Sequence, residues 1–225
     1  MSKNLTQSIE DYLKAIYELT RQENRASTTS LSECLEVTPA SITGMIQKLA
    51  STDPPLVEYK KHHGVALTAE GKKVALETIR HHRLLEMFLH QILGYPWDEV
   101  HEEADRLEHV ISEQFEERIA VALGNPRRDP HGDPIPRQDL FLPESPETPL
   151  SMMLPNQRAT IKRVRDDDPA MLRYLSSLDL IPGTNVLVTA YSEFDGNLSI
   201  QINNSENETV LGSRVTSQIF VEINP

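Results

Sequence analysis

The stretch from His101 to His109 places carboxylates and imidazoles close together on a predicted helix. At about 100° per residue, His101, Asp105, Glu108 and His109 fall within an arc of roughly 100°. Carboxylates and imidazoles cost free energy when they are buried without partners. This face must therefore contact water or surround a positive charge, and the fold has to provide one of the two.

A second pair of the same kind lies upstream, where His82 and Glu86 are spaced i, i+4 and so lie one above the other on a helix. Residues 84–123 carry ten acidic and two basic side chains, a composition typical of a solvated helical face. A zinc-protease helix is excluded, because Asp105 stands where the H-E-x-x-H pattern beginning at His101 needs its second histidine. A solvated face and a metal site both remain open.

The length of 225 residues allows one large domain or two small ones, with a substantial core. No apolar run approaches the ~20 residues of a membrane span, and no signal peptide opens the chain. The single cysteine, Cys34, excludes an intramolecular disulfide, and its apolar phase predicts a core position. We therefore expect a cytoplasmic protein with no membrane partner.

Residues 27–38 and 39–50 predict two short helices joined by a tight turn. Residues 28–30 can cap the first helix, and Thr38 followed by Pro39 is a typical start for the second. The second helix has one apolar face and one small, polar or basic face, which can approach base edges in the major groove. The residues that we expect to face the groove are Pro39, Ala40, Ser41 and Thr43, with Lys48 directed at phosphates.

A basic hairpin follows, with strands predicted at 56–60 and 65–68 around a tip that contains Gly64. A helix-turn-helix followed by such a hairpin is typical of a winged helix. The net charge of −12 argues against nucleic acid, but residues 38–73 carry five lysines against three acids. Lys60 and Lys61 are predicted to contact phosphates. The adjacent His62 and His63 do not predict a metal site, because neighbouring side chains at a hairpin tip point to opposite faces.

The remaining chain predicts three further parts and an α+β fold class. Long helices at about 70–93 and 97–123 exceed what a small winged domain can bury, which favours a homodimer reading two half-sites. Eight prolines within 125–155 indicate a linker, and short β-rich runs with a helix at 169–178 indicate a small β-barrel. The predicted domains are a winged helix-turn-helix (1–73), a helical dimerisation region (74–124), the linker (125–155) and the barrel (156–225).

Three segments, 10–19, 82–86 and 100–109, resemble the diphtheria-toxin-repressor family of metal-dependent transcription regulators. The order of parts is also similar, including a C-terminal Src-homology-3-like barrel of the ferrous-iron-transport protein A type. The resemblance implies a repressor of metal uptake rather than an enzyme. It implies a homodimer that binds a palindromic operator in double-stranded DNA when metal is present.

The resemblance also implies two metal sites. The regulatory site would consist of Asp11, Asp105, Glu108 and His109. The ancillary site would consist of His82, Glu86 and His101, with Asp168 from the barrel as the remaining ligand. In the segment 129–132, Asp129 stands where the family has a cysteine, so we do not assign it to either site.

The types of ligand atom in the predicted regulatory site indicate which metal would bind there. The predicted regulatory site contains oxygen and imidazole ligands without sulfur, which favours Mn(II), with Fe(II) as the alternative. Lys14 replaces a carboxylate of some manganese-responsive members, so we expect two separate sites with part of the ligand charge neutralised. A metal-independent winged-helix regulator remains a rival. A carboxylate-bridged metalloenzyme does not, because the chain lacks the two Glu-x-x-His motifs it requires.

Overall fold

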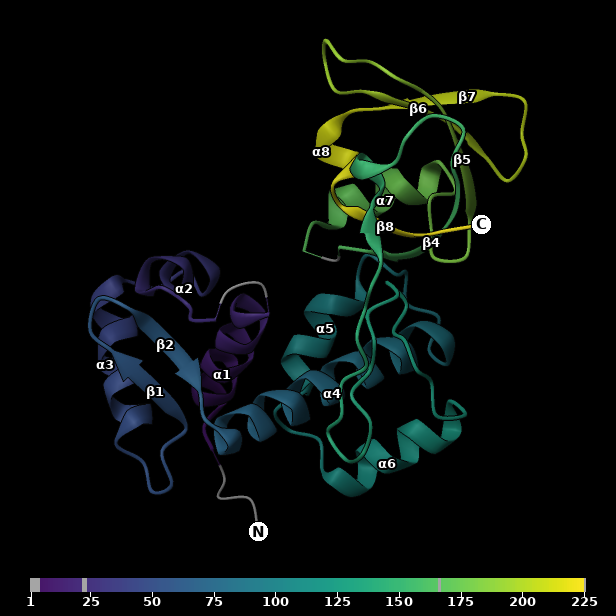
Figure 1. Ribbon diagram of the computed structural model, residues 1–225. Coiled ribbons are helices and arrows are strands. Elements are labelled where there is room, and N and C mark those ends of the chain that lie inside the picture. Colours follow the sequence, from purple (N-terminus) through teal and green to yellow (C-terminus); the bar gives the residue numbers. More distant parts are fainter. Residues whose placement is uncertain (1–4, 22–23, 166, 225) are drawn as a thin grey trace. The chain divides into compact units, whose positions relative to one another are not determined.

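The computed structural model describes residues 5–21, 24–165 and 167–224, and its contacts divide the chain into two compact units (Figure 1). Unit 1 extends to His81 and also contains Glu108–Ile111 and Pro136–Leu142. Unit 2 contains His82–Leu107, Ser112–Ile135 and the chain from Pro143 onward. These units differ from the four consecutive domains predicted from the sequence. Residues 108–111 and 136–142 belong to unit 1, although each of these stretches follows a part of unit 2 in the chain.

Unit 1 is a winged helix-turn-helix, as predicted. Its fold begins with three helices, continues with an antiparallel hairpin and ends in the first part of a long helix. The elements are α1 (Gln7–Thr20), α2 (Thr28–Cys34), α3 (Pro39–Ala50), β1 (Val57–Lys60), β2 (Gly64–Leu67) and α4 (Ala69–Gln91), which continues into unit 2.

Side-chain caps fix the two helices of the helix-turn-helix. The hydroxyl of Thr38 accepts a hydrogen bond from the backbone N–H of Ser41, and Pro39 occupies the first turn of α3, as predicted. The cap of α2 is Ser27, which accepts from the N–H of Ser30, so the cap predicted at 28–30 is wrong by one residue. A residue at the cap position needs extended backbone angles, and Ser27 is the last residue before the helix that has them.

The wing is attached through Ala26, whose backbone exchanges two hydrogen bonds of 2.8 and 2.9 Å with Val65. Gly64 has φ +85°, and a Cβ there would lie 2.3 Å from the carbonyl oxygen of Ala26. The core beneath is built from fully buried aliphatic side chains, namely Leu13, Ile16, Leu31, Ile42, Ile46 and Leu49. Cys34 is exposed, so its predicted core position is wrong; α2 ends at this residue and Leu35 packs against the core instead.

The long helix predicted over 97–123 is two helices, α5 (Val100–Leu107) and α6 (Glu113–Ala122). The side chain of Ser112 accepts the N–H of Phe115 and so starts a new helix, while β-branched Val110 and Ile111 separate the two. Glu108 and His109 lie in the turn between these helices. The single helical face predicted for residues 101–109 is therefore wrong for these two residues.

The C-terminal part of unit 2 is the predicted Src-homology-3-like domain. Its sheet is antiparallel, with the strand order β3-β8-β4-β5-β6-β7. The strands are β3 (Thr148–Pro149), β4 (Arg158–Val164), β5 (Asn185–Tyr191), β6 (Leu198–Ile202), β7 (Glu208–Leu211) and β8 (Ile219–Ile223). A 3₁₀ turn, η1 (Leu150–Met152), and two helices, α7 (Pro169–Ser177) and α8 (Ser213–Thr216), complete the domain.

The proline-rich segment 125–155 does more than connect two parts. Residues 131–136 are buried, and β3 pairs with β8 at one edge of the sheet. Trp97, which precedes α5, is 9% exposed and belongs to the core of the C-terminal domain. The segment between α4 and α5 therefore shares buried contacts with this domain through Trp97. None of the described helices is long and apolar enough to cross a membrane.

A pair of glycine substitutions tests the packing at the start of α4. A Cβ on Gly71 would lie 2.0 Å from the backbone oxygen of Leu56, so Gly71→Ala should lower the free energy of unfolding by about 1–3 kcal/mol. In α3, a Cβ on Gly44 meets nothing within 4 Å, and Gly44→Ala should raise it by about 0.5–1 kcal/mol. Urea denaturation followed by circular dichroism measures both. Equal effects would contradict the close approach at Gly71.

Candidate metal centre

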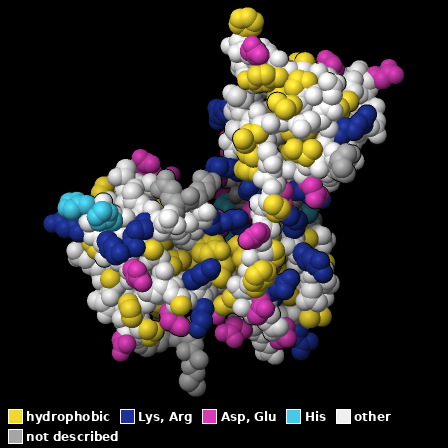
Figure 2. Space-filling view, in the orientation of Figure 1, with side chains coloured by type: hydrophobic (Ala, Val, Ile, Leu, Met, Phe, Trp, Pro, Cys, Tyr) yellow, Lys and Arg dark blue, Asp and Glu magenta, His cyan; other side chains and the backbone are white. Residues whose placement is uncertain are grey.

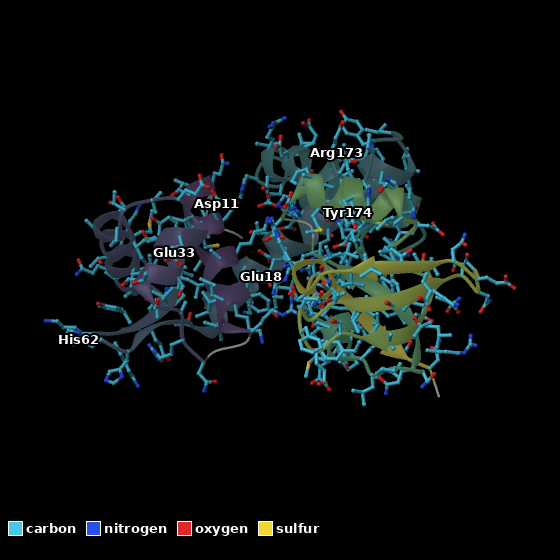
Figure 3. All side chains as sticks on the ribbon, turned by 90° about the horizontal axis from the view of Figure 1, so that it is seen from above. Asp11, Glu18, Glu33, His62, Arg173 and Tyr174 are labelled. Atoms are coloured by element: carbon cyan, nitrogen blue, oxygen red, sulfur yellow. The ribbon has the colours of Figure 1, made fainter. Side chains whose placement is uncertain are left out.

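Unit 1 brings together Asp11, Glu108 and His109, which we call the Asp11 cluster. One ligand atom from each lies within 4.8 Å of the other two. The Nε2 atom of His109 is 2.8 Å from Oδ1 of Asp11 and 3.3 Å from Oε1 of Glu108. Asp11 comes from α1 (Figure 3), and the other two come from the turn after α5. Oxygen and imidazole atoms converging in this way suit a divalent transition metal.

Lys14 and Glu10, both charged, also contact the Asp11 cluster. Lys14 donates to both carboxylate oxygens of Glu108, at 2.9 and 3.1 Å, as expected of a cation that neutralises ligand charge. The Oε2 atom of Glu10 lies 2.6 Å from Nδ1 of His109. Sequence analysis missed Glu10, because the direction in which the ring of His109 points was not accessible from the residue pattern.

Asp105 lies in unit 2, where its carboxylate contacts two histidines. Its Oδ1 is 3.2 Å from Nδ1 of His82, and its Oδ2 is 3.6 Å from Nε2 of His101. The assignment of Asp105 to the regulatory site stays a prediction.

A second group of metal-ligating residues lies in unit 2 around Glu86. We call it the Glu86 cluster: Glu86, His82, His101, Asp129 and His131. The fully buried Glu86 has its Oε1 2.9 Å from Nε2 of His82, 3.2 Å from Nδ1 of His101 and 3.9 Å from Nδ1 of His131. The structure thus brings together the three helical residues predicted for the ancillary site.

The structure does not bring the predicted barrel ligand, Asp168, into this cluster. Its Oδ1 accepts the backbone N–H groups of Ala170 and Met171 at 2.9 and 3.1 Å, which makes it the cap of α7. Among the described residues, no group with metal-ligand spacing includes Asp168. The residue before Pro169 is a typical cap position, and the capping interaction accounts for this carboxylate.

The segment 129–132, which we did not assign to either metal site from the sequence, supplies two members of the Glu86 cluster, Asp129 and His131. Oδ1 of Asp129 accepts the N–H groups of His131 and Asp133, both at 2.9 Å, which shapes the turn. Nε2 of His131 donates to the carbonyl of Trp97 at 2.7 Å, which leaves Nδ1 directed toward Glu86. The sequence contained a signal for this segment, because aspartate can bind metal, as can the cysteine that the family has at this position.

An ion network holds this turn between α4 and β4. Nη1 of Arg83 donates to the carbonyl of Pro134 at 2.7 Å, and the guanidinium lies 3.6 Å from Asp129 and 3.6 Å from Asp133. Arg163 of β4 lies 3.7 Å from the other oxygen of Asp133. Gly132, with φ +94°, sits so close to β4 that a Cβ would lie 1.9 Å from the carbonyl oxygen of Lys162. Both neighbouring elements therefore fix where His131 points.

The predicted DNA-contacting residues lie on one helix and the wing of unit 1. Most of them are exposed: Pro39, Ala40, Ser41, Lys48, Lys60 and Lys61. Thr43 is half-buried, and its hydroxyl donates to the carbonyl of Pro39 at 2.9 Å. Figure 2 shows basic and histidine side chains gathered at one edge of the winged helix, and Figure 3 shows His62 pointing away from it.

The single thiol is not part of either cluster. Partial desolvation, with a further contribution from the carboxylate of Glu18, raises the pKa of the Cys34 thiol above its usual value. The thiol is therefore protonated at neutral pH, whereas a metal ligand must be a thiolate.

Three family models match consecutive parts of the chain and together span most of it. Residues 4–65 match the N-terminal DNA binding domain of iron dependent repressors, and residues 68–137 match their metal binding and dimerisation domain. Residues 148–223 match the FeoA domain. The iron-dependent repressor IdeR of Mycobacterium leprae (strain TN) is 30% identical over 223 residues, which cover 92% of this chain and 94% of that protein.

The chain belongs to the diphtheria-toxin-repressor family.

Other similar proteins are named as transcriptional regulators or repressors, and two of the three that follow are named for manganese. The transcriptional regulator MntR of Shouchella clausii (strain KSM-K16) is 37% identical over 114 residues, covering 51% of this chain and 78% of that protein. A solved manganese-dependent transcriptional repressor in complex with manganese is 40% identical, with a TM-score of 0.87, and covers 96% of this chain and 100% of its own. The manganese regulator SloR is 33% identical, with a TM-score of 0.78, and covers 98% of this chain and 100% of its own.

Metal stoichiometry tests the Glu86 cluster. If both clusters bind metal, wild-type protein should bind two Mn(II) ions per chain in equilibrium dialysis, and Glu86→Gln should bind one, because the central anionic ligand is lost. Glu99→Gln is the matched control, since Glu99 is exposed in the same unit and belongs to neither cluster. Two ions per chain in Glu86→Gln would show that this carboxylate is not a ligand.

Proposed function

We propose that the chain is a Mn(II)-activated transcriptional repressor of metal uptake that acts in the cytoplasm as a homodimer on a palindromic operator. The observation that carries the proposal is the Asp11 cluster, which combines a residue of the winged helix with two residues of a turn far along the chain. Membership of a repressor family with DNA-binding and dimerisation domains supports it. The structural relative solved with manganese supports the choice of metal.

The chemistry of the ligands also favours manganese over softer metals. The Asp11 cluster consists of two carboxylates and one imidazole, and hard oxygen ligands suit Mn(II). When bound, Mn(II) would supply the positive charge that offsets the carboxylates of Asp11 and Glu108. Relatives named iron-dependent repressors make Fe(II) the alternative metal.

The position of the cluster in the chain suggests how metal binding controls DNA binding. Asp11 is on α1, and Glu108 and His109 belong to a segment continuous with α5 on one side and α6 on the other. By binding the same ion, these residues would restrain the winged helix relative to this segment. Both recognition helices of a dimer would then keep the half-site spacing of the operator. The metal shifts this population only by its differential affinity for the restrained state.

In DNA binding, the start of α3 and the lysines of α3 and the wing would have different roles. Pro39, Ala40, Ser41 and Thr43, at the start of α3, would approach base edges in the major groove. Lys48 and the exposed wing lysines, Lys60 and Lys61, would contact phosphates and so position the helix.

Loss of Asp11 should uncouple DNA binding from metal. In Asp11→Ala, Mn(II) should no longer promote binding to a palindromic duplex selected from random DNA with the wild-type protein and Mn(II), because the ligand from α1 is missing. Fluorescence anisotropy measures DNA binding, and analytical ultracentrifugation should show an unchanged dimer. Glu18→Ala, on the same helix but outside the cluster, is the control that should respond normally.

The same titration separates the alternatives for the wild-type protein. Binding at lower Mn(II) than anaerobic Fe(II) concentrations would support the manganese assignment, and the reverse order would make the protein an iron-responsive repressor. Binding that survives a chelator, or a normal Mn(II) response in Asp11→Ala, would contradict the proposal and favour a metal-independent regulator.

The wing lysines can be tested through salt dependence. Lys60→Ala should reduce the slope of log K against log salt concentration by about 0.9, because one phosphate contact releases roughly that many counterions. Lys162→Ala serves as the control, since Lys162 lies on β4 and pairs with Glu222 at 2.7 Å. An unchanged slope in Lys60→Ala would remove this lysine from the DNA interface.

A further inference from the structure

We propose that Glu10 is a positioning residue of the Asp11 cluster and that it acts on metal binding through His109. The inference rests on the proposed function, because it assigns Glu10 a role at the same site. The two ring nitrogens of His109 have different partners. Nδ1 lies 2.6 Å from Oε2 of Glu10, and Nε2 lies 2.8 Å from Oδ1 of Asp11 and 3.3 Å from Oε1 of Glu108.

The chemistry of the ring assigns a role to each nitrogen. A neutral imidazole has one N–H donor and one acceptor nitrogen, and an ionised carboxylate only accepts. Donation from Nδ1 to Glu10 therefore leaves the lone pair of Nε2 directed to the place where the oxygens of Asp11 and Glu108 converge. A histidine that binds metal usually donates its other N–H to a carboxylate or carbonyl, which fixes its tautomer and ring orientation. Glu10 supplies this partner.

The location of Glu10 separates it from the ligands themselves. It contacts the ring nitrogen that is directed away from the cluster, and the described residues grouped by metal-ligand spacing include Asp11 but not Glu10. The side chain of His109 is only 5% exposed, and that of Glu10 is 23% exposed, so the contact is shielded from water. Consecutive residues of α1 thus hold one imidazole from two sides, Asp11 at the metal-facing nitrogen and Glu10 at the other.

Equilibrium Mn(II) binding, followed by the electron paramagnetic resonance of free Mn(II), tests the role of Glu10. Glu10→Ala should bind Mn(II) at the Asp11 cluster about 10- to 100-fold more weakly, the usual loss when the partner of a ligand histidine is removed. Glu10→Gln keeps a hydrogen-bond acceptor for Nδ1–H and should lose less. Glu18→Gln removes the same charge from α1 outside the cluster and should bind as wild type.

A double-mutant cycle with His109→Ala distinguishes positioning from direct ligation. If Glu10 acts through the ring, Glu10→Ala should cause no further loss of Mn(II) affinity once His109 is already alanine. All variants should share the wild-type urea midpoint in the presence of chelator. If the Glu10→Ala chain is destabilised, Glu10→Gln, which preserves the size of the side chain, takes its place in the cycle.

Three outcomes would overturn the inference. Wild-type Mn(II) affinity in Glu10→Ala would show that the contact does not matter for binding. An equal loss in the His109→Ala background would show that Glu10 acts as a ligand or only through its charge. Wild-type Mn(II) binding in Asp11→Ala and His109→Ala would show that the cluster does not bind this metal, and the proposed function would then fail as well.

Discussion

The arrangement of unit 2 depends on the contacts of one fully buried carboxylate, that of Glu86. Burying the charge of Glu86 without partners would cost far more free energy than a domain can spare, so positive or hydrogen-bonding groups must surround it. His82, from the same helix, and His101, from α5, lie within hydrogen-bonding distance of it, and Nδ1 of His131, from the proline-rich segment, lies 3.9 Å away. Elements that are far apart in the sequence are thereby required to meet at one point.

Polar and steric contacts near this carboxylate fix the position of the turn that carries His131. The turn that carries His131 is shaped by Asp129, held by Arg83 and Arg163 through Asp133, and pressed so closely against β4 that glycine is required at position 132. Buried ion pairs of this kind contribute little net stability after desolvation, but they leave few alternative arrangements. The precision that a metal site needs is therefore provided by its polar neighbours as well as by apolar packing.

The Asp11 cluster follows the same rule in unit 1 with different partners. Glu108 is nearly inaccessible to solvent, and Lys14 donates to both of its oxygens, while Glu10 and Asp11 contact opposite nitrogens of His109. Residues 10, 11 and 14 lie on one face of α1, so a single helix supplies the proposed ligand Asp11, the carboxylate that we propose orients His109, and the cation. Because these residues belong to α1, metal bound at the cluster would act directly on the DNA-binding unit that contains this helix.

The resemblance to the family, rather than any local pattern, implied the six predicted ligands that the structure places in the two clusters. Local patterns in the sequence determined the winged helix and most strands of the C-terminal domain. These features depend on periodicity, caps and turn residues, which act over a few neighbouring positions. Only the tertiary structure decided that the helix ends before Glu108, that Asp168 caps α7, and that Asp129, His131 and Glu10 join the clusters. Such contacts depend on the three-dimensional approach of segments distant in sequence, and side-chain orientation is set by packing rather than by residue spacing.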